Sequence, residues 1–247
     1  MSNRRWRLWL GLGLAAIAGV LFLVHYLIFR DSHHLGIFTL HDLAFLPVEV
    51  LLVTLILHAL LEHRRHNELI QKLNMVIGAF FSEVGIDLLK RLAVLDTNRD
   101  RLERSFKLDG NWDDKRLKQA SGEASSGGFD LKPTRESIRE MRGFMSDKRS
   151  FILGLLENQN VLENERFTDV LWAVFHLGDE LTRRIHIDAL PDSDVAHIAV
   201  DMERAYGRMI CEWFEHLRHL KVRYPYLYSL SVRSNPLDEE ARVEVSS

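Results

Sequence analysis

The stretch that decides the fold is Leu43 to Leu61, LAFLPVEVLLVTLILHALL. It is almost entirely apolar, and an apolar helix of about 20 residues spans the hydrocarbon core of a bilayer. Beyond it, Glu62 to Leu95 keeps apolar residues at helical spacing but gains a charged face. We therefore predict one continuous helix from about Leu43 to about Leu95. Its first part crosses a membrane, and its second part forms the spine of a soluble domain.

A second apolar segment, Leu8 to Phe29, precedes this helix and carries no charged side chain, although His25 within it can titrate. Basic residues precede the segment, as they do in a secretory signal peptide. The apolar run is too long for a signal peptide, however, and no small-x-small cleavage site follows it. We therefore predict a retained transmembrane helix. The predicted fold is all-α: a two-helix transmembrane hairpin over residues 1–61, with spans at about 8–29 and 43–61, continues into a cytosolic helical bundle.

The distribution of basic residues predicts the orientation of the hairpin. They lie outside the two spans: Arg4, Arg5 and Arg7 precede the first span, and Arg64, Arg65 and Lys72 follow the second. Between the spans, the segment from Arg30 to about Leu40 has Arg30 as its only lysine or arginine. Positive residues favour the cytoplasmic side of a membrane. We predict a multi-pass protein of the cell inner (plasma) membrane with both termini in the cytoplasm.

Small residues recur every four positions in the first span, at Gly11, Ala15 and Gly19. Such a face lets two helix backbones approach closely in lipid, where van der Waals packing drives association. It predicts either a face that pairs two copies of the chain or packing against the second span of the same chain.

Three ionisable residues are predicted to lie in or near the spans: His25, Asp42 and Glu49. An ionisable group is costly to bury in a bilayer, so it is often paired or functional. Asp42 and Glu49 share a helical face, and Pro47 between them loosens the backbone. The functional interpretation is a proton or cation path, or a pH-sensitive pair. The structural interpretation is a polar clasp, with a hydrogen bond between His25 and Glu49 and with Asp42 in the headgroup region.

The remainder, residues 62–236, is predicted to form the cytosolic helical bundle, followed by a charged tail at residues 237–247. The charge-rich segment at about 96–130 ends in SGEASSGG, and this composition predicts short helices in a flexible, peripheral segment. Apolar residues at helical spacing predict further helices at about 134–144, 146–156, 165–187 and 194–222. The aromatic run YPYLYSLSVRSNP, residues 224–236, is predicted to be extended along an edge of the bundle.

The best metal-like pattern is Glu212, His216 and His219, which lie within one arc of the last long helix. Imidazole and carboxylate groups bind divalent transition metals. Three potential ligands on the preceding helix could face this set: His176, Asp179 and Glu180. The alternative is that all of these are flank charges paired with neighbouring arginines. A di-metal site of the ferritin type requires Glu-x-x-His pairs that the chain lacks, so we predict no cofactor and keep Glu212, His216 and His219 as weak metal candidates.

Other functional classes leave no pattern in the sequence. The chain has no Gly-rich phosphate loop, no G-x-S-x-G motif and no zinc-type cysteine pairs. Its single cysteine, Cys211, excludes an internal disulfide framework. The net charge of −3 argues against binding to nucleic acid. No catalytic residue set is visible, so an enzyme is not favoured.

Three segments together resemble a family of uncharacterised prokaryotic membrane proteins. They are LNMVIGAFFSEVG (residues 73–85), FTDVLWAVFHLGDEL (167–181) and HLRHLKVRYPYLYSLSVRSNP (216–236). The resemblance covers most of the chain outside residues 96–130. It implies two membrane spans and a helical cytosolic domain, and it implies no activity.

The function predicted from these patterns is non-enzymatic: a membrane-anchored helical module for interaction or sensing. The expected partners are the lipid bilayer, other copies of the chain in a homo-oligomer, and a cytosolic protein. One alternative is a subunit of an oligomeric ion channel or transporter whose path is lined by Glu49 and Asp42. A weaker alternative is a membrane-bound metalloenzyme that uses Glu212, His216 and His219.

Overall fold

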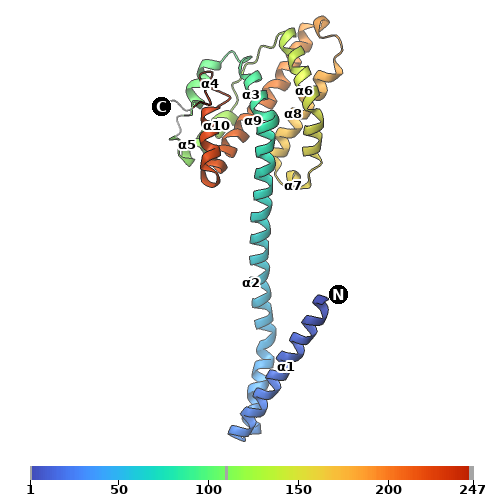
Figure 1. Cartoon of the computed structure of the whole chain (residues 1–247), viewed down its shortest axis with the longest axis vertical. Helices are drawn as coiled ribbons and strands as arrows, with labels where there is room; N and C mark the ends of the chain where they lie inside the picture. Colours follow the sequence, from blue (N-terminus) through green and yellow to red (C-terminus); the bar gives the residue numbers. More distant parts are fainter. Residues whose placement is uncertain (1, 109–110, 245–247) are drawn as a thin grey trace. The chain divides into compact units, whose positions relative to one another are not determined.

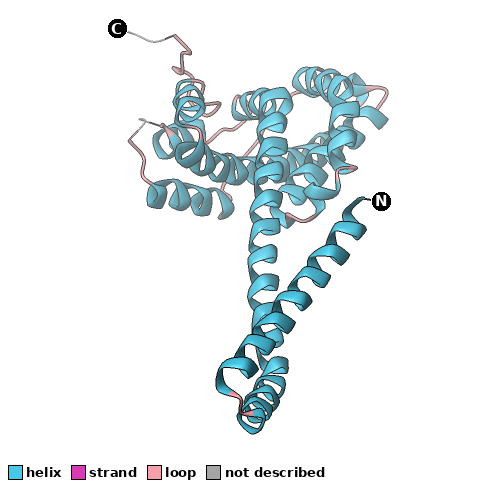
Figure 2. Ribbon diagram, turned by 60° about the horizontal axis from the view of Figure 1, so that its bottom comes forward, coloured by secondary structure: helices cyan, strands magenta, loops and turns pink. Residues whose placement is uncertain are grey.

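The computed structural model describes residues 2–108 and 111–244, and over these residues the chain is built from helices (Figures 1 and 2). The chain divides into two compact units, Met1–His66 and Asn67–Ser247. In order, the helices are α1 (Ser2–Phe29), α2 (Ser32–Phe80), the π-helix η1 (Phe81–Gly85), α3 (Ile86–Ala93), α4 (Arg99–Phe106), α5 (Asp114–Ser125), α6 (Arg135–Leu156), α7 (Gln159–Leu162), α8 (Glu165–Arg183), the 3-10 helix η2 (Ile187–Ala189), α9 (Asp192–Arg223) and α10 (Pro225–Arg233). Among the described residues the one β pairing is an isolated bridge between Asp96 and Leu131. The all-helical class predicted from the sequence is confirmed.

The N-terminal unit contains α1 and the first part of α2, joined by a very short connection. Arg30 adopts a left-handed backbone conformation with φ of 50°. The carboxylate of Asp31 then accepts hydrogen bonds from the backbone N–H groups of His33 and His34, both at 3.0 Å. This capping starts α2 at Ser32, so the segment predicted as a link between the spans is helical. Two helical stretches, Leu8–Phe29 and His33–Ala93, are long and apolar enough to span a bilayer.

The predicted continuous helix from about Leu43 to about Leu95 is present, and it begins earlier than expected. It runs through α2, η1 and α3, and η1 is a single π-helical segment that the sequence did not predict. The segment ends at Gly85, where an added Cβ would meet the Phe81 ring at 2.6 Å. Only glycine leaves room there for the rings of Phe80 and Phe81, which are both fully buried.

Helix α9 is the centre of the C-terminal unit. It lies between α5 and α10 on one side and α8 on the other, and α6 covers the outer side of α8 (Figure 1). The core of the C-terminal unit is rich in aromatic rings. Between ring centroids, Phe81 lies 5.0 Å from Trp213 of α9, and Phe80 lies 5.5 Å from Phe167 of α8. These contacts pack the spine helix, which is the continuous helix formed by α2, η1 and α3, against α8 and α9.

The segment at about 96–130 contains two short helices, α4 and α5, as predicted. It is not peripheral, however, because α5 packs along α9. Leu117 and Ala120 of α5 are fully buried, and the Ser121 hydroxyl donates a hydrogen bond to the Cys211 carbonyl oxygen at 3.2 Å. Two of the small residues that suggested a linker, Ser121 and Ala124, are buried in α5.

Two further predictions about the helices are wrong. Residues 134–156 form one helix, α6, and not two, although Thr134 caps it as expected by accepting a hydrogen bond from the Ser137 N–H. The segment predicted as extended, residues 224–236, contains α10, which begins at Pro225, where the missing proline N–H costs no hydrogen bond. The residues predicted as a charged tail begin with a buried side chain, since Leu237 is 3% exposed.

The packing of α5 gives a direct test. Leu117→Ala should lower the free energy of unfolding of the C-terminal unit by about 2–5 kcal/mol, because it removes a fully buried leucine from the core. The measurement is urea denaturation of the full-length protein, followed by tryptophan fluorescence. Lys118→Ala on the exposed face of the same helix is the control, with an expected effect within about 0.5 kcal/mol. Equal small effects from both variants would show that this segment is peripheral.

Candidate functional site

A cavity of 680 Å³ lies in the C-terminal unit between the spine helix, α9 and α10. Its apolar wall comes from all three elements: Met75, Phe81 and Ile86 on the spine, Trp213 and Leu220 on α9, and Leu227 and Leu230 on α10. This volume falls within the range of about 300–1,000 Å³ that is usual for small-molecule sites. The cavity is therefore large enough for a ligand with a substantial apolar body.

Two residues of the cavity wall carry buried ring nitrogens without a hydrogen-bond partner. They are Nδ1 of His216 and Nε1 of Trp213. Burial lowers the pKa of His216 to about 4, with a smaller contribution from His219, so its imidazole is neutral at physiological pH. The His216 ring stacks on Phe81 at 5.4 Å between centroids. Buried polar atoms normally have a hydrogen-bond partner. Two buried nitrogen atoms without one, beside the same cavity, make this cavity a candidate binding site.

The polar part of the cavity wall carries potential positive charge. Arg223 is exposed at the end of α9, and His219 lies one turn before it. Burial lowers the pKa of His219, and the charge of Arg223 lowers it further. Asn74 on the spine donates its side-chain N–H to the Ile70 carbonyl oxygen at 2.9 Å, which leaves its amide oxygen as an acceptor. An apolar body with an anionic or acceptor end fits this distribution.

Glu212, His216 and His219, which the sequence suggested as metal ligands, do not gather around one point. Among the described residues, the group of three or more potential ligands with atoms within 4.8 Å of one another is a different set, Glu180, His197 and Asp201. His216 and His219 line the cavity, and Glu212 is directed towards Arg166 of α8. Glu212 is 3% exposed and His216 is 6% exposed. Charged residues on the solvent-facing flank of a helix would be more exposed than this.

Glu212 lies outside the wall of the cavity, one residue before Trp213, and is buried. Burial raises its pKa to about 7, although the guanidinium of Arg166 acts in the opposite direction. The ion pair is weak because Arg166 Nε lies 3.9 Å from Glu212 Oε2 and the arginine side chain is 62% exposed. Desolvation of the carboxylate therefore outweighs the attraction.

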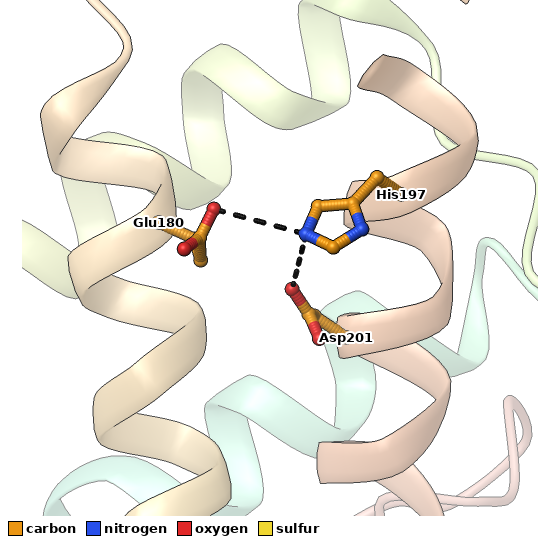
Figure 3. Close-up of side chains that lie close together, drawn as sticks. All are labelled: Glu180, His197 and Asp201. Atoms are coloured by element: carbon orange, nitrogen blue, oxygen red, sulfur yellow. Dashed lines mark ion pairs between the residues drawn. The ribbon is translucent and has the colours of Figure 1, made fainter. Parts of the chain in front are cut away.

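A second cluster of polar groups lies between α8 and α9 (Figure 3). His197 Nε2 is 3.5 Å from Asp201 Oδ2 and 4.0 Å from Glu180 Oε2. His176 Nε2, on α8, is also 3.5 Å from Asp201 Oδ2. The sequence singled out His176 and Glu180 but missed His197 and Asp201. The signal was present, because each helix carries a histidine followed four residues later by a carboxylate, and such residues share a helix face.

The ionisable residues of the N-terminal unit remain apart. His25 contacts the ring of Phe29 at 4.8 Å between centroids, and Asp42 and Glu49 are exposed. Within the described part of this unit no hydrogen bond joins His25 to Glu49. Added Cβ atoms at Gly11 or Gly19 would meet nothing within 4 Å, so neither glycine is packed against the second helix. Pairing of two chains through Gly11, Ala15 and Gly19 remains a prediction.

The fold and cavity define an all-helical protein with an apolar N-terminal helical hairpin and a ligand-sized site in a C-terminal helical domain. The chain belongs to the MJ1433 family. The model described as "Uncharacterized protein MJ1433, C-terminal helical domain" matches residues 69–233, and that of the N-terminal helical domain of MJ1433 matches residues 2–61. These descriptions confirm helical domains in both parts and name no activity.

A curated relative supports the same assignment. The chain is 37% identical over 242 residues to "Uncharacterized protein MJ1433" of Methanocaldococcus jannaschii, and the match covers 98% of this chain and 97% of the relative. No solved structure matches. The resemblance inferred from the sequence is thus confirmed for the family and its helical domains, while the two membrane spans remain a prediction.

The raised pKa of Glu212 has a consequence for stability. The folded protein keeps this proton up to about pH 7, whereas an unfolded glutamate loses it near 4.5. The folded state therefore binds more protons between these values, and this contribution to stability falls as the pH rises through the window. His216 acts in the opposite sense, because its lowered pKa removes stability as the pH falls from about 6.5 to about 4.

Glu212→Gln should become more stable relative to the wild-type protein as the pH rises from 5 to 8, by on the order of 2–3 kcal/mol, because glutamine removes the buried ionisation. The measurement is the free energy of unfolding of both proteins at each pH. Glu215→Gln is the control, since Arg218 donates a hydrogen bond to Glu215 at 2.8 Å and this residue shows no such burial. A difference that stays constant between pH 5 and 8 would show that Glu212 is already ionised in the folded protein.

Proposed function

We propose that this protein is a membrane-anchored sensory module in which the N-terminal helices hold the chain in a bilayer and the C-terminal domain binds a small amphiphilic molecule. Two properties support anchoring. The apolar side chains of α1 and of the first part of α2 are exposed, which is unfavourable in water and expected in lipid. The basic residues on both sides of the hairpin match the positive-inside rule.

The observation that carries the sensing role is the position of the cavity against η1. Phe81 and Ser82 of this π-helical segment line the cavity, as does Ile86 directly after it. π-helical turns inside α-helices are rare and occur often at functional sites. Conversion of such a turn to α-helix changes the register by one residue, which rotates one side of the helix relative to the other by about 100°. A ligand that favours one of the two registers would therefore change the helix that also contains the predicted span.

The lining residues favour a particular ligand class. Met75, Ile86, Leu227 and Leu230 offer an apolar surface, and Arg223 offers a positive charge at the rim. A fatty carboxylate or another molecule with an apolar chain and an anionic end has the matching properties. Binding of this kind needs no catalytic set, so the proposed module is non-enzymatic, and homo-oligomers formed through the small-residue face of α1 fit the same role.

The anchoring part predicts a labelling pattern. In a Cys211→Ser background, Gly36→Cys should react with a membrane-impermeant maleimide in intact spheroplasts, and Glu244→Cys should react only after the membrane is opened. Both positions are exposed, and a side chain at Gly36 meets nothing within 4 Å. The reverse pattern would overturn the topology. Recovery of the wild-type protein in the soluble fraction would overturn the anchoring.

The sensing part predicts a specific cross-link. A photoreactive decanoate should label residues of the cavity wall in the full-length protein held in nanodiscs, as mapped by mass spectrometry. Ser82→Trp should reduce this labelling about tenfold, because it fills the cavity beside η1. Ser229→Trp is the matched control, since Ser229 is exposed on α10 and lies outside the cavity wall. Labelling confined to the N-terminal helices, or equal labelling in both variants, would contradict the proposed ligand site.

A further inference from the structure

We infer that α8 and α9 together bind a divalent transition-metal ion through Glu180, His197 and Asp201, with His176 within reach as the fourth ligand. This site is separate from the cavity and does not depend on the proposed sensing role. The ligands come as two pairs, His176 with Glu180 on α8 and His197 with Asp201 on α9. In each pair the two residues are four positions apart, so both side chains leave the same face of their helix.

The distances between the ligand atoms match those around a metal ion. Zn²⁺ lies about 2.0–2.2 Å from histidine nitrogen and carboxylate oxygen, which places neighbouring ligands of a tetrahedral site about 3.4 Å apart. Asp201 Oδ2 is 3.5 Å from Nε2 of both His176 and His197, and His197 Nε2 is 4.0 Å from Glu180 Oε2. Glu180, His197 and Asp201 face one another (Figure 3), and small side-chain rotations would bring these three groups and His176 to one ion.

The state of Asp201 is the second, independent observation. Its side chain is only 2% exposed, and its Oδ2 is buried without a hydrogen-bond donor. An unpaired carboxylate oxygen in that position is costly. The other oxygen, Oδ1, accepts a hydrogen bond from Arg204 at 2.5 Å, which fixes the orientation of the group. Oδ2 therefore points between the two imidazoles, where a bound cation would satisfy it.

The surrounding charges are compatible with a cation. Arg184 contacts Glu180 Oε2 at 2.6 Å but also binds Asp194, with Nε to Oδ2 at 2.7 Å. Its positive charge is therefore divided between two carboxylates. Arg204 contacts Asp201 through the oxygen that is not directed at the histidines. With Glu180, Asp194 and Asp201 against these two arginines, the formal charge of the cluster is −1 before a metal binds.

The donor set indicates the class of metal. Imidazole nitrogen suits Zn²⁺, Ni²⁺, Cu²⁺ and Fe²⁺, whereas Ca²⁺ and Mg²⁺ prefer sites made of oxygen ligands alone. Four protein ligands would close the coordination sphere, which is typical of a structural zinc site. Because the ligands lie on two helices, the ion would hold α8 against α9.

The test uses the full-length protein, purified without a histidine tag and stripped of metal with a chelator. We expect it to bind about one Zn²⁺ per chain in competition with a chromophoric chelator, and to give with Co²⁺ the strong visible absorption of four-coordinate cobalt. His197→Gln and Asp201→Asn should each weaken Zn²⁺ binding by about tenfold or more, since even outer-shell partners of metal ligands have effects of that size. His197 is 57% exposed, so its replacement spares the core.

The matched control is His186→Gln, which changes an exposed histidine outside both the cluster and the cavity. This variant should bind Zn²⁺ like the wild-type protein. Less than about one tenth of an equivalent of Zn²⁺ on the wild-type protein would overturn the site. Equal binding by wild-type, His197→Gln and Asp201→Asn proteins would also overturn it, because the metal would then lie elsewhere. His176→Gln tests the fourth ligand alone, and an unchanged cobalt spectrum in that variant would remove His176 from the site.

Discussion

The contact on which the C-terminal unit depends is the packing of Phe80 and Phe81 around Gly85. A helix that carries two adjacent large rings cannot bury both on one face with regular α geometry, because successive residues differ in direction by about 100°. Both rings are buried here because they face different helices, and the missing Cβ of Gly85 gives them space. Phe80 then reaches Phe167 on α8 and Phe81 reaches Trp213 on α9. Phe81 also lines the cavity, so the core and the candidate ligand site share this residue.

Helix α9 is a second constraint, because it buries polar groups that most amphipathic helices keep in solvent. Asp201, Glu212 and His216 are all less than 9% exposed. The cost of burial is reduced in a different way for each residue: Glu212 has a raised pKa, His216 has a lowered pKa, and Asp201 accepts a hydrogen bond from Arg204 at Oδ1. A protein stabilised by packing alone would gain from apolar residues at these positions. Groups with perturbed pKa values cluster at functional sites, which makes α9 a candidate for binding.

Much of the architecture could be predicted from apolar periodicity, since the spine helix, α8 and α9 each carry a long apolar face. The prediction failed where burial does not depend on large apolar residues. In α5 the buried positions near the end are Ala120, Ser121 and Ala124, which are indistinguishable from a linker by composition. The prediction of the polar cluster between α8 and α9 failed for another reason. Each helix pair of histidine and carboxylate is visible in the sequence, but which pairs meet depends on how α8 and α9 are rotated, and periodicity alone placed His176 and Glu180 against Glu212.

The two candidate sites occupy different parts of α9, and this separation bears on how a sensor of this kind would work. Asp201 and His216 are separated along the helix by about 22 Å at 1.5 Å per residue. An ion at the first position would join α9 to α8 and make that pair rigid. Binding energy from a ligand at the second position would then act on the element that we propose to have two registers, the π-helical segment, because the opposite wall would be held in place. Coupling between sites requires such an element with two discrete states. If the α8–α9 pair is rigid, more of the conformational change caused by the ligand occurs in the spine helix.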